Sequence, residues 1–462
     1  MSTTYHRSYP LKHFANQSKV DIIVATLFEY RKTAQKLADN QWRIFFETGK
    51  FNKNESKLRK NTESKLTERY NQTAQYQVVG ALKSFISNRK NDFNRIVYFS
   101  SLSDSAKKEL YVINKRQEWF KPGNKLARKI LKHVLKKHKE PSFAKCNMVL
   151  DAKQMSIETS KSKNFDYWIS LSTIDKGKKI YVPLRSNTYF NSQDGDTCNS
   201  IQVNYNNERK TLSFSLVKEK EKRQYIPETD RIGLDIGLNY ICATNFGDLF
   251  GRSDRVLNVL KKYDHLITEL ARNRQKQRLK TRSPKYDNLV NNVREFLKNE
   301  INRILNQIVK LYKPGEIVVE GLLFQNINLS KRLNRILSNF GRNIFQKKLY
   351  SLFEEYGIVI TEVNAAYTSQ ECSICHYVDK KNRKTRNSFS CRNCGKKLHA
   401  DINASRTIFN RRSIKELAGK YITKPLILRI LRKMYFGEDA KRNKDAAYSP
   451  AMSLTRNQTG CG

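Results

Sequence analysis

The feature that most limits how this chain can fold is a set of four cysteines near its C-terminal end. Two Cys-x-x-Cys pairs, Cys372/Cys375 and Cys391/Cys394, are separated by fifteen residues. Each pair places two thiolates on one tight turn, and two such turns can close a tetrahedral zinc site. Four thiolates leave no open coordination position, so the spacing predicts a structural zinc ion. A metal-free or redox-active set of thiols is the alternative.

Positive charge runs through the whole chain. Lysine and arginine number 88 against 43 acidic residues, which gives a formal net charge of +45. Such an excess repels itself in a compact fold unless a polyanion neutralises part of it. Nucleic acid is the obvious partner, although ribosomal or histone-like proteins carry similar charge. The 23 tyrosines and 23 phenylalanines offer rings on which bases can stack, and many of them will simply be core residues.

Membrane insertion and secretion are not expected. No stretch is apolar enough to span a bilayer, and residues 1–7 lack the apolar region of a signal peptide. We therefore expect an intracellular protein without membrane contact. In that compartment eight cysteines favour metal binding or free thiols over disulfides.

The N-terminal part of the chain has helical periodicity. After a short basic leading segment, residues 1–14, several helices are predicted over residues 15–141. The first of these begins near Ser18 and stops at Gly49. Residues 125–139 predict a strongly basic helix. For one such helix a solvated face is the simpler explanation, whereas several in one region favour a lobe that faces a polyanion.

Beyond Pro141 the hydrophobic period changes to two, which predicts strands. A small β-rich module is expected over residues 142–228, and we group residues 1–14 with it. The segment 191–200 is polar and is predicted to be turn-like.

From Arg231 the pattern is mixed α/β. Buried strands are predicted at residues 232–238, 317–320 and 358–363, with long helical stretches between them. Residues 437–462 are polar and predict a disordered tail.

Three acidic residues stand out by their placement. Asp235 lies within a buried-strand pattern, Glu320 ends another, and Asp401 begins a predicted helix. Taken singly, each is more simply explained by a salt bridge or by a strand end that faces water, because an unpaired buried carboxylate is costly. Three of them, with the turn Asp235-Ile236-Gly237, predict a shared site for Mg²⁺ or Mn²⁺. Two such ions ~4 Å apart clamp the attacking and leaving oxygens of a phosphodiester.

Other candidates are weaker. Glu362, Asp248 and Asp230 are acidic residues near predicted strands that could support such a site. The seven histidines show no HxH or HExxH spacing, and there is no P-loop. A histidine-based metalloenzyme and an ATP-driven motor are therefore not expected.

The order of these motifs resembles the split RuvC nuclease of TnpB proteins and of the compact type V CRISPR effectors related to them. The similarity rests on residues 233–237, 318–320 and 400–404 together with the four cysteines, and residues 367–373 strengthen it. It covers about residues 229–412. In the N-terminal half, only the length, the charge and the order of helical lobe and β module agree.

This resemblance implies a multidomain α+β protein that ends in an RNase-H-like RuvC domain with an inserted zinc ribbon. The implied domains are a helical recognition lobe (15–141), a small β-rich, wedge-like module (1–14 and 142–228), a split RuvC nuclease domain (229–366 and 396–436) and a zinc ribbon that binds target nucleic acid (367–395), followed by the tail (437–462).

The resemblance also implies an RNA-guided DNA endonuclease that reads a short flanking motif and hydrolyses phosphodiester bonds with the help of metal ions. Its partners would be a guide RNA and double-stranded target DNA. A cytoplasmic, nucleoid-associated monomer is expected, with a dimer as the alternative. The implied site residues are Asp235, Glu320 and Asp401 for catalysis and for Mg²⁺ (or Mn²⁺), and Cys372, Cys375, Cys391 and Cys394 for a structural Zn²⁺.

Two departures from the family pattern stand out. His376 occupies a position where a glycine usually follows the first cysteine pair, and histidine tolerates a positive φ better than most residues do. Gly321 and Leu322 follow Glu320 where the family often has an acidic residue.

Two other functions stay open. One is a guided DNA-binding protein without efficient cleavage, and the other is an unguided zinc-ribbon protein that binds nucleic acid. Charge that follows phosphates gives affinity without sequence specificity, whereas pairing with a guide supplies the specificity. RNA guidance therefore rests on the resemblance, and both a transposon-encoded and a CRISPR-associated protein are compatible with these motifs.

Overall fold

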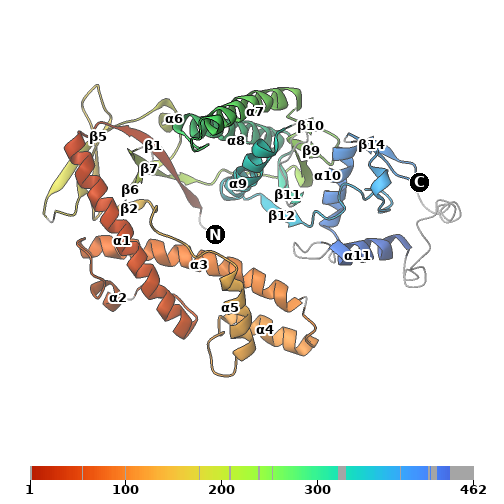
Figure 1. Cartoon of the computed structure of the whole chain (residues 1–462), viewed down its shortest axis with the longest axis horizontal. Coiled ribbons are helices and arrows are strands. Elements are labelled where there is room, and N and C mark those ends of the chain that lie inside the picture. The colour runs from red at the N-terminus through yellow and green to blue at the C-terminus, as the bar shows by residue number, and fades with distance from the viewer. Residues whose placement is uncertain are drawn as a thin grey trace. The chain divides into compact units, whose positions relative to one another are not determined.

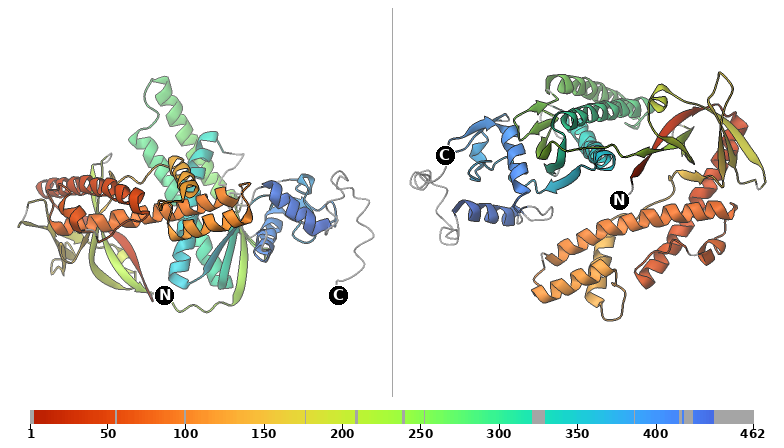
Figure 2. Two further views of the ribbon diagram at one scale, coloured as in Figure 1. Left: turned by 90° about the horizontal axis from the view of Figure 1, so that it is seen from below. Right: turned by 180° about the vertical axis from the view of Figure 1, so that it is seen from behind.

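The described part of the chain contains both helices and strands, and the chain divides into two units, Met1–Glu221 and Lys222–Gly462. Each unit has its own β-sheet (Figures 1 and 2). The predicted α+β class with more than one structural unit is confirmed. The computed structural model describes residues 3–54, 56–98, 100–175, 177–207, 210–237, 240–251, 253–320, 329–385, 387–414, 417 and 424–436.

Seven antiparallel strands form the sheet of the first unit. They are β1 (Thr4–His13), β2 (Met148–Asp151), β3 (Met155–Thr159), β4 (Tyr167–Ser172), β5 (Lys179–Arg185), β6 (Asp196–Asn206) and β7 (Thr211–Glu221). Their order is β2-β6-β7-β1-β5-β4-β3, so β1 lies in the middle. Residues 1–14, which the sequence groups with the β-rich module as a short basic leading segment, contribute the strand β1 to this sheet, although no strand was predicted there. Tyr5, Tyr9 and Leu11 alternate into the core between polar residues, which is the pattern of a half-buried strand.

The helices of the first unit lie mainly between β1 and β2 in the chain. They are α1 (Gln17–Thr48), α2 (Ser56–Lys60), α3 (Glu68–Tyr98), α4 (Asp104–Arg116), α5 (Lys125–Lys136) and α6 (Thr188–Asn191). As predicted, α1 ends at Gly49, which takes the left-handed conformation with a φ of 77°. The predicted basic helix is α5. One continuous apolar cluster includes residues of α1, α3 and the sheet.

The predicted turn-like segment 191–200 is only partly correct. It begins at the end of α6, but β6 already starts at Asp196. The polar residues there occupy an exposed strand, so their polarity reflects solvent contact and not a turn.

The second unit is built on a mixed sheet. Its strands are β8 (Thr229–Ile236), β9 (Cys242–Thr244), β10 (Leu249–Phe250), β11 (Pro314–Glu320) and β12 (Val359–Val363), with a separate pair β13 (Ser388–Ser390) and β14 (Lys397–His399). The five-stranded order is β10-β9-β8-β11-β12. β8, β9 and β10 are antiparallel neighbours, whereas β11 is parallel to both β8 and β12.

Helices cover both faces of this mixed sheet. On one face lie α7 (Ser253–Lys276), α8 (Pro284–Tyr312) and α9 (Lys331–Tyr356), and on the other lies α10 (Ala400–Arg411). The short 3₁₀ helix η1 (Lys380–Asn382) and α11 (Lys424–Phe436) also belong to this unit. Leu234 and Val319 pack with residues of α7, α8 and α9, and α7 and α8 lie side by side (Figure 1). Val318 packs instead with Ile408 of α10. Neighbouring residues of one strand therefore serve opposite faces, as the pleat requires.

Within the part of the chain that the structure describes, no helix combines the length and the apolar character needed to cross a bilayer. The predicted tail 437–462 lies outside the described residues, as do Gly321, Leu322 and the end of the predicted strand at Leu238.

Candidate functional site

Two of the predicted acidic residues lie at the carboxyl ends of neighbouring parallel strands. Leu234 of β8 pairs with Val319 of β11, so the residues that follow them, Asp235 and Glu320, lie at the same edge of the sheet. Leu234 and Val319 face the core formed with α7, α8 and α9. Because side chains alternate along a strand, Asp235 and Glu320 face the opposite side, where α10 packs.

Asp401 approaches the same place from α10. It lies in the first turn of this helix, whose N-cap is His399, and the helix dipole favours a carboxylate there. α10 can approach β8 closely because residue 233 is a glycine. A Cβ atom at Gly233 would lie 2.6 Å from the carbonyl oxygen of Ser405 and 2.7 Å from Cβ of Phe409. The structure thus brings all three predicted acids together.

The two neighbouring carboxylates affect the ionisation of Asp235. Burial raises the pKa of Asp235 well above its usual range, and the charges of Glu320 and Asp401 raise it further. Burial also raises the pKa of Glu320, although the Thr368 hydroxyl opposes this by donating a hydrogen bond of 2.6 Å to Glu320 Oε2. A cluster of this kind holds all its negative charges only when positive charge is supplied.

Arg383 supplies part of that positive charge. Its Nη2 atom lies 3.3 Å from Oδ1 of Asp401. Its charge also lowers the pKa of both Asp235 and Glu320. The sequence did not single out Arg383, because residues 380–386 contain several lysines and arginines and no local pattern shows which of them reaches the acids.

The donor set of the cluster fits hard divalent cations, which prefer carboxylate oxygens. Among the described residues, the three carboxylates do not bring one oxygen each within 4.8 Å of one another. A single ion would therefore require side-chain movement. Two ions ~4 Å apart, each ~2 Å from its ligands, span oxygens up to ~8 Å apart.

The weaker acidic candidates are placed differently. Asp230 has a side chain that is 95% exposed, and Asp248 accepts a hydrogen bond from the hydroxyl of Tyr312. Glu362, in contrast, lines a cavity together with Glu320. Of these three acids, Glu362 is the one that the structure brings beside the cluster.

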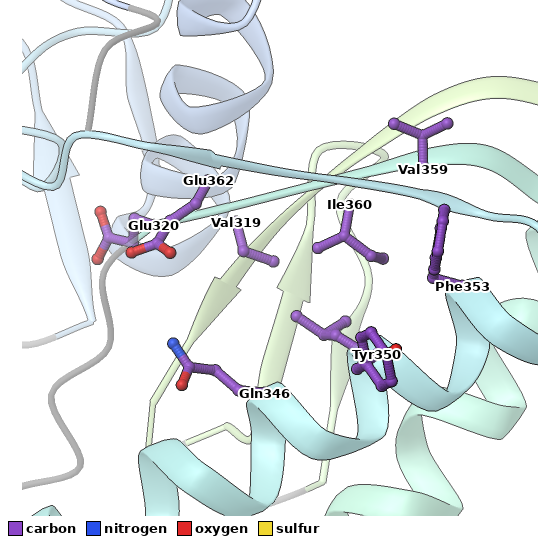
Figure 3. Close-up of a pocket in the computed structure, with 9 residues that line it drawn as sticks. Val319, Glu320, Gln346, Tyr350, Phe353, Val359, Ile360 and Glu362 are labelled. Carbon is purple, nitrogen blue, oxygen red and sulfur yellow. The ribbon is translucent and has the colours of Figure 1, made fainter. Parts of the chain in front are cut away.

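This cavity, about 420 Å³ in volume, opens next to Glu320 (Figure 3). The two glutamates lie toward one end of it, and the remaining lining is mainly apolar and aromatic. Side chains of β11, β12 and α9 contribute this lining: Val319, Gln346, Leu349, Tyr350, Phe353, Val359 and Ile360. Tyr350 and Phe353 are 61% and 44% exposed, and their ring centroids are 6.4 Å apart. The carboxylates therefore border a surface on which flat rings can pack.

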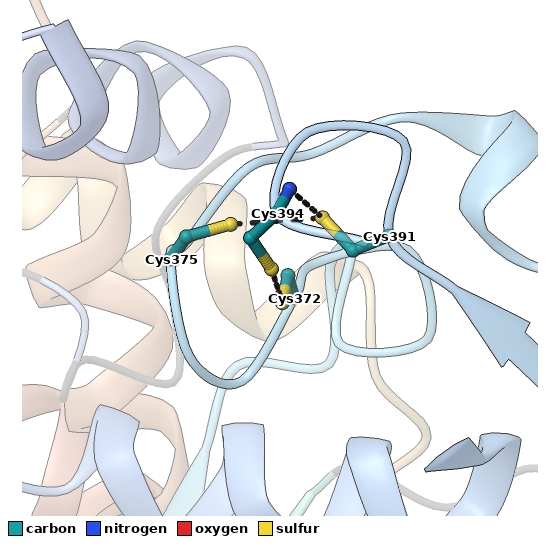
Figure 4. A group of neighbouring side chains, drawn as sticks. All are labelled: Cys372, Cys375, Cys391 and Cys394. Atoms are coloured by element: carbon teal, nitrogen blue, oxygen red, sulfur yellow. Dashed lines mark hydrogen bonds between the residues drawn. The ribbon is translucent and has the colours of Figure 1, made fainter. Parts of the chain in front are cut away.

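The four predicted cysteines converge on one point (Figure 4). The Sγ atoms of Cys372 and Cys394 are 3.7 Å apart, and those of Cys375 and Cys391 are 3.6 Å apart. All four sulfurs lie within 4.8 Å of one another. Four sulfurs ~2.3 Å from a tetrahedral zinc ion are roughly 3.8 Å apart, whereas a disulfide requires ~2.05 Å. The cluster is therefore able to bind zinc.

The residues that follow each cysteine pair take the left-handed conformation. φ is 59° at His376 and 72° at Gly395. Histidine thus adopts the conformation that a glycine would provide, as expected for this departure. In addition, Nδ1 of His376 lies 2.8 Å from Oε1 of Glu371, which ties the first cysteine turn to the residue before it.

A buried ion pair joins the first cysteine turn to α10. Arg411 donates two hydrogen bonds, of 2.6 and 3.1 Å, to Oε2 of Glu371, and both side chains are fully buried. The Asn403 side chain accepts from the Ser373 amide at 3.0 Å and donates to the Glu371 carbonyl at 2.8 Å. The helix that carries Asp401 is therefore fastened to the cysteine cluster. The sequence gives no sign of this network, because Glu371 and Arg411 are 40 residues apart.

One family model matches this region of the chain. Residues 343–408 match the family model "Cas12f1-like, TNB domain". The chain is 32% identical over 117 residues to the CRISPR-associated endodeoxyribonuclease Cas12f1 of Sulfoacidibacillus thermotolerans, and 37% identical over 62 residues to that of Syntrophomonas palmitatica. These stretches cover 25% and 13% of this chain. They span 27% and 12% of the two relatives, about a quarter of their length or less.

The chain resembles the cryo-EM structure of the Cas12f1-sgRNA-target DNA complex, with 18% identity, a TM-score of 0.45 and coverage of 88% of this chain and 99% of that one. It also resembles CasPhi-2 (Cas12j) bound to crRNA, with 10% identity, a TM-score of 0.43 and coverage of 91% and 98%. Together, the family model and the two curated relatives support kinship with a compact type V or TnpB-like family.

Proposed function

We propose that this protein is an RNA-guided DNA endonuclease of the TnpB kind that hydrolyses DNA at Asp235, Glu320 and Asp401. One observation carries the proposal: two strand-borne acids and one helix-borne acid, distant in the sequence, meet on one face of a mixed sheet. The order of that sheet, with an antiparallel meander followed by two parallel strands, supports an RNase-H-like RuvC domain.

Mg²⁺ or Mn²⁺ is the cofactor that this donor set favours. When bound, such ions activate a water molecule and neutralise charge on the phosphate. The contribution of the chain is to hold the ligands in place. Asp235 and Glu320 end two adjacent strands of a buried sheet, and Asp401 is held by the contacts of α10. Arg383, beside Asp401, adds positive charge where a scissile phosphate would lie.

Guide RNA and double-stranded target DNA are the proposed partners. The net charge of +45 supports a polyanionic partner, and the curated relatives are CRISPR-associated endodeoxyribonucleases. Basic side chains gather along α5, where a cavity of about 480 Å³ is lined by Lys125, Arg128, Lys129, Lys132, His133 and Lys136. Such a surface attracts phosphates without regard to sequence. We place the protein in the cytoplasm at the nucleoid, acting as a monomer.

The division of labour follows the boundaries expected from the sequence. We assign recognition of nucleic acid and of a flanking motif to the first unit. DNA cleavage is assigned to the split RuvC domain, and loading of target DNA to the ribbon. The segments are 15–141 (recognition lobe), 1–14 and 142–228 (wedge-like module), 229–366 and 396–436 (RuvC) and 367–395 (ribbon).

A plasmid-cleavage assay with the co-purified RNA tests the proposal. Asp235→Ala is expected to lower Mg²⁺-dependent cutting on the order of 10³-fold, because several kcal/mol of transition-state stabilisation depend on the ions. Binding of RNA and DNA should persist. Asp230→Ala is the matched control, since it removes an exposed acid from the same strand. Cutting that survives Asp235→Ala would refute the assigned site.

The same preparation separates the alternative functions. Wild-type protein that binds its target but never cuts in Mg²⁺ or Mn²⁺ is a guided binder. Sequencing the co-purified RNA addresses guidance itself, because an unguided protein would carry no discrete RNA species.

A further inference from the structure

A second group of metal-binding side chains lies on the sheet of the first unit. His6 of β1, Cys198 of β6 and Glu219 of β7 each bring a ligand atom within 4.8 Å of the other two. None of these three residues has a part in the proposed nuclease. They come from three strands that are neighbours in the sheet, in the order β6-β7-β1.

Strand register explains why two of the three side chains meet. His6 pairs directly with Glu219 across β1 and β7, and Glu219 pairs directly with Asp196 across β7 and β6. Residues directly opposite each other project from the same face of a sheet. His6, Glu219 and Asp196 are exposed, whereas Tyr5, next to His6, is buried. The hydroxyl of Thr4 donates a hydrogen bond of 2.7 Å to Oε1 of Glu219 and so orients this carboxylate.

Cys198 joins the group because β6 is irregular at this point. The register of β6 with β7 shifts between Thr197 and Ile201, so Cys198 lies in a bulge. A bulge re-aims side chains that regular alternation would place elsewhere. Just before it, Gly195 has a φ of 95°, and a Cβ atom there would collide with the carbonyl oxygen of Glu219. This glycine lets the start of β6 lie tightly against β7.

The loop that leads into β6 is also anchored to β7. Lys218 is 8% exposed, and its ammonium group donates to the carbonyl oxygens of Gln193 at 2.6 Å and of Phe190 at 3.2 Å. The backbone just before Cys198 is therefore held against β7.

The charges around Cys198 favour the binding of a cation. Glu219 and Asp196 lie directly opposite each other, and like charges in that relation destabilise a sheet. Two acids and a thiol thus gather around one imidazole in a chain whose net charge is +45.

We propose that His6, Cys198 and Glu219 bind a second zinc ion, which fastens the N-terminal strand to β6 and β7. Imidazole nitrogen, thiolate sulfur and carboxylate oxygen are the three donor types that Zn²⁺ takes in proteins. The soft sulfur donor disfavours Mg²⁺ and Ca²⁺. Ligand atoms around a tetrahedral zinc ion are roughly 3.3–3.8 Å apart, so side chains that already lie within 4.8 Å need to move by only about 1 Å.

Three protein ligands leave a fourth position for water, with Asp196 nearby. The site would link the first and the last strand of the unit near their ends, Thr4 on β1 and Glu221 on β7. Because metal binding contributes to folding free energy, the ion would act as a staple at this end of the sheet.

Zinc content of the full-length protein gives the first test. Wild-type protein freed of excess metal should contain two zinc ions per chain by mass spectrometry, one at the four cysteines and one at the new site. Cys198→Ser and His6→Gln should each contain one. The matched controls are Cys146→Ser and His133→Gln, which change a cysteine and a histidine of the same unit outside the group, and both should keep two. One zinc ion in the wild type, or two in Cys198→Ser, would overturn the proposal.

The alkylation rate of Cys198 gives a second test, which reports on this site and not on the four-cysteine cluster. Full-length protein stripped of metal is treated with iodoacetamide with or without ZnCl₂, and the peptide that contains Cys198 is quantified. Zinc should slow its alkylation at least about tenfold, because a metal-bound thiolate is no longer a free nucleophile. His6→Gln and Glu219→Gln should abolish this protection, and His133→Gln should retain it. An unchanged rate in the wild type, or protection that survives His6→Gln, would reject the site.

Discussion

The carboxylate cluster and the cysteine cluster in the second unit are both suited to cations, but the chain builds them in opposite ways. The cysteines lie within residues 372–394, on two short turns, and their sulfurs all lie within 4.8 Å of one another. The carboxylates come from positions 235, 320 and 401, and their meeting depends on the register of β8 with β11 and on the packing of α10. A structural metal site can thus be encoded locally, whereas the predicted catalytic site requires the finished fold.

The two clusters also differ in their electrostatics. The charges of Glu320 and Asp401 raise the pKa of Asp235, and the charge of Arg383 opposes this. The cysteine sulfurs instead lie at hydrogen-bond distances from one another. Yet the two clusters are joined, because Glu371 beside the first cysteine is fastened to the helix of Asp401. Removal of zinc should therefore disturb the positions of the carboxylates, whereas removal of magnesium should leave the cysteines in place.

Zinc removal should have the largest effect. Structural zinc ions contribute roughly 10–16 kcal/mol in small zinc domains, so Cys391→Ser or a strong chelator should unfold the ribbon locally. Because α10 loses its anchor, cleavage should fall roughly 10–100-fold, as when support around a metal site is removed. Hydrogen exchange of residues 367–411, together with cleavage rates, measures both effects. Cys146→Ser is the control, and unchanged exchange in α10 would show that the clusters are independent.

Breaking the buried ion pair should have the next largest effect. Arg411→Met leaves Glu371 buried without its partner, which costs about 3–5 kcal/mol in such pairs. The double variant Arg411→Met/Glu371→Leu should recover a large part of that loss, since apolar pairs replace buried ion pairs well. Denaturant unfolding of both variants measures the difference. If the single variant is as stable as the double variant, the pair does not hold α10 in place.

The smallest effect on stability, and one of opposite sign, is expected for Asp235→Asn. In magnesium-free buffer it should stabilise the protein by roughly 0.5–2 kcal/mol, because it removes a charge from a repulsive cluster. This corresponds to ~2–4 °C in Tm per kcal/mol for a unit of this size.

The pH dependence follows from the raised pKa of Asp235. The folded protein holds this proton more tightly than the unfolded chain does, so wild-type stability is lost as pH rises through the raised value. The advantage of Asp235→Asn should therefore grow from acidic to neutral pH and disappear when Mg²⁺ is added. An advantage that is constant with pH would mean that repulsion is not its cause.

The features that could be predicted from the sequence are those encoded by residues close together in the chain. The spacing of the cysteines, the end of α1 at Gly49 and the basic helix α5 are encoded by residues close together, and each is found as predicted. The positions of Asp235 within one buried strand and of Glu320 at the end of another were also predictable, because buried-strand patterns are visible in the chain.

The features that escaped prediction depend on distant partners. The strand β1 was not predicted, because its alternation of apolar and polar residues is short and is interrupted by basic residues. This segment becomes a strand through its pairing with β5 and β7 on either side. Arg383, Glu371 and Arg411 are ordinary charged residues in the sequence. Their roles appear only when α10 lies against the first cysteine turn, and no spacing rule links residues 40 positions apart.

The central position of β1 has a consequence for the way this protein is made. Its pairing with β7 joins residues that are 215 positions apart, as between Thr4 and Glu219. At ~5–20 residues per second, a ribosome needs roughly 10–40 s to make that stretch. During this time the first strand to leave the ribosome has no partner on its β7 side, and the sheet around it closes only when the last strand of the unit emerges. The yield of folded protein should therefore depend on the rate of synthesis. An extension fused ahead of Thr4 should lower that yield far more than an extension at the other end of the unit.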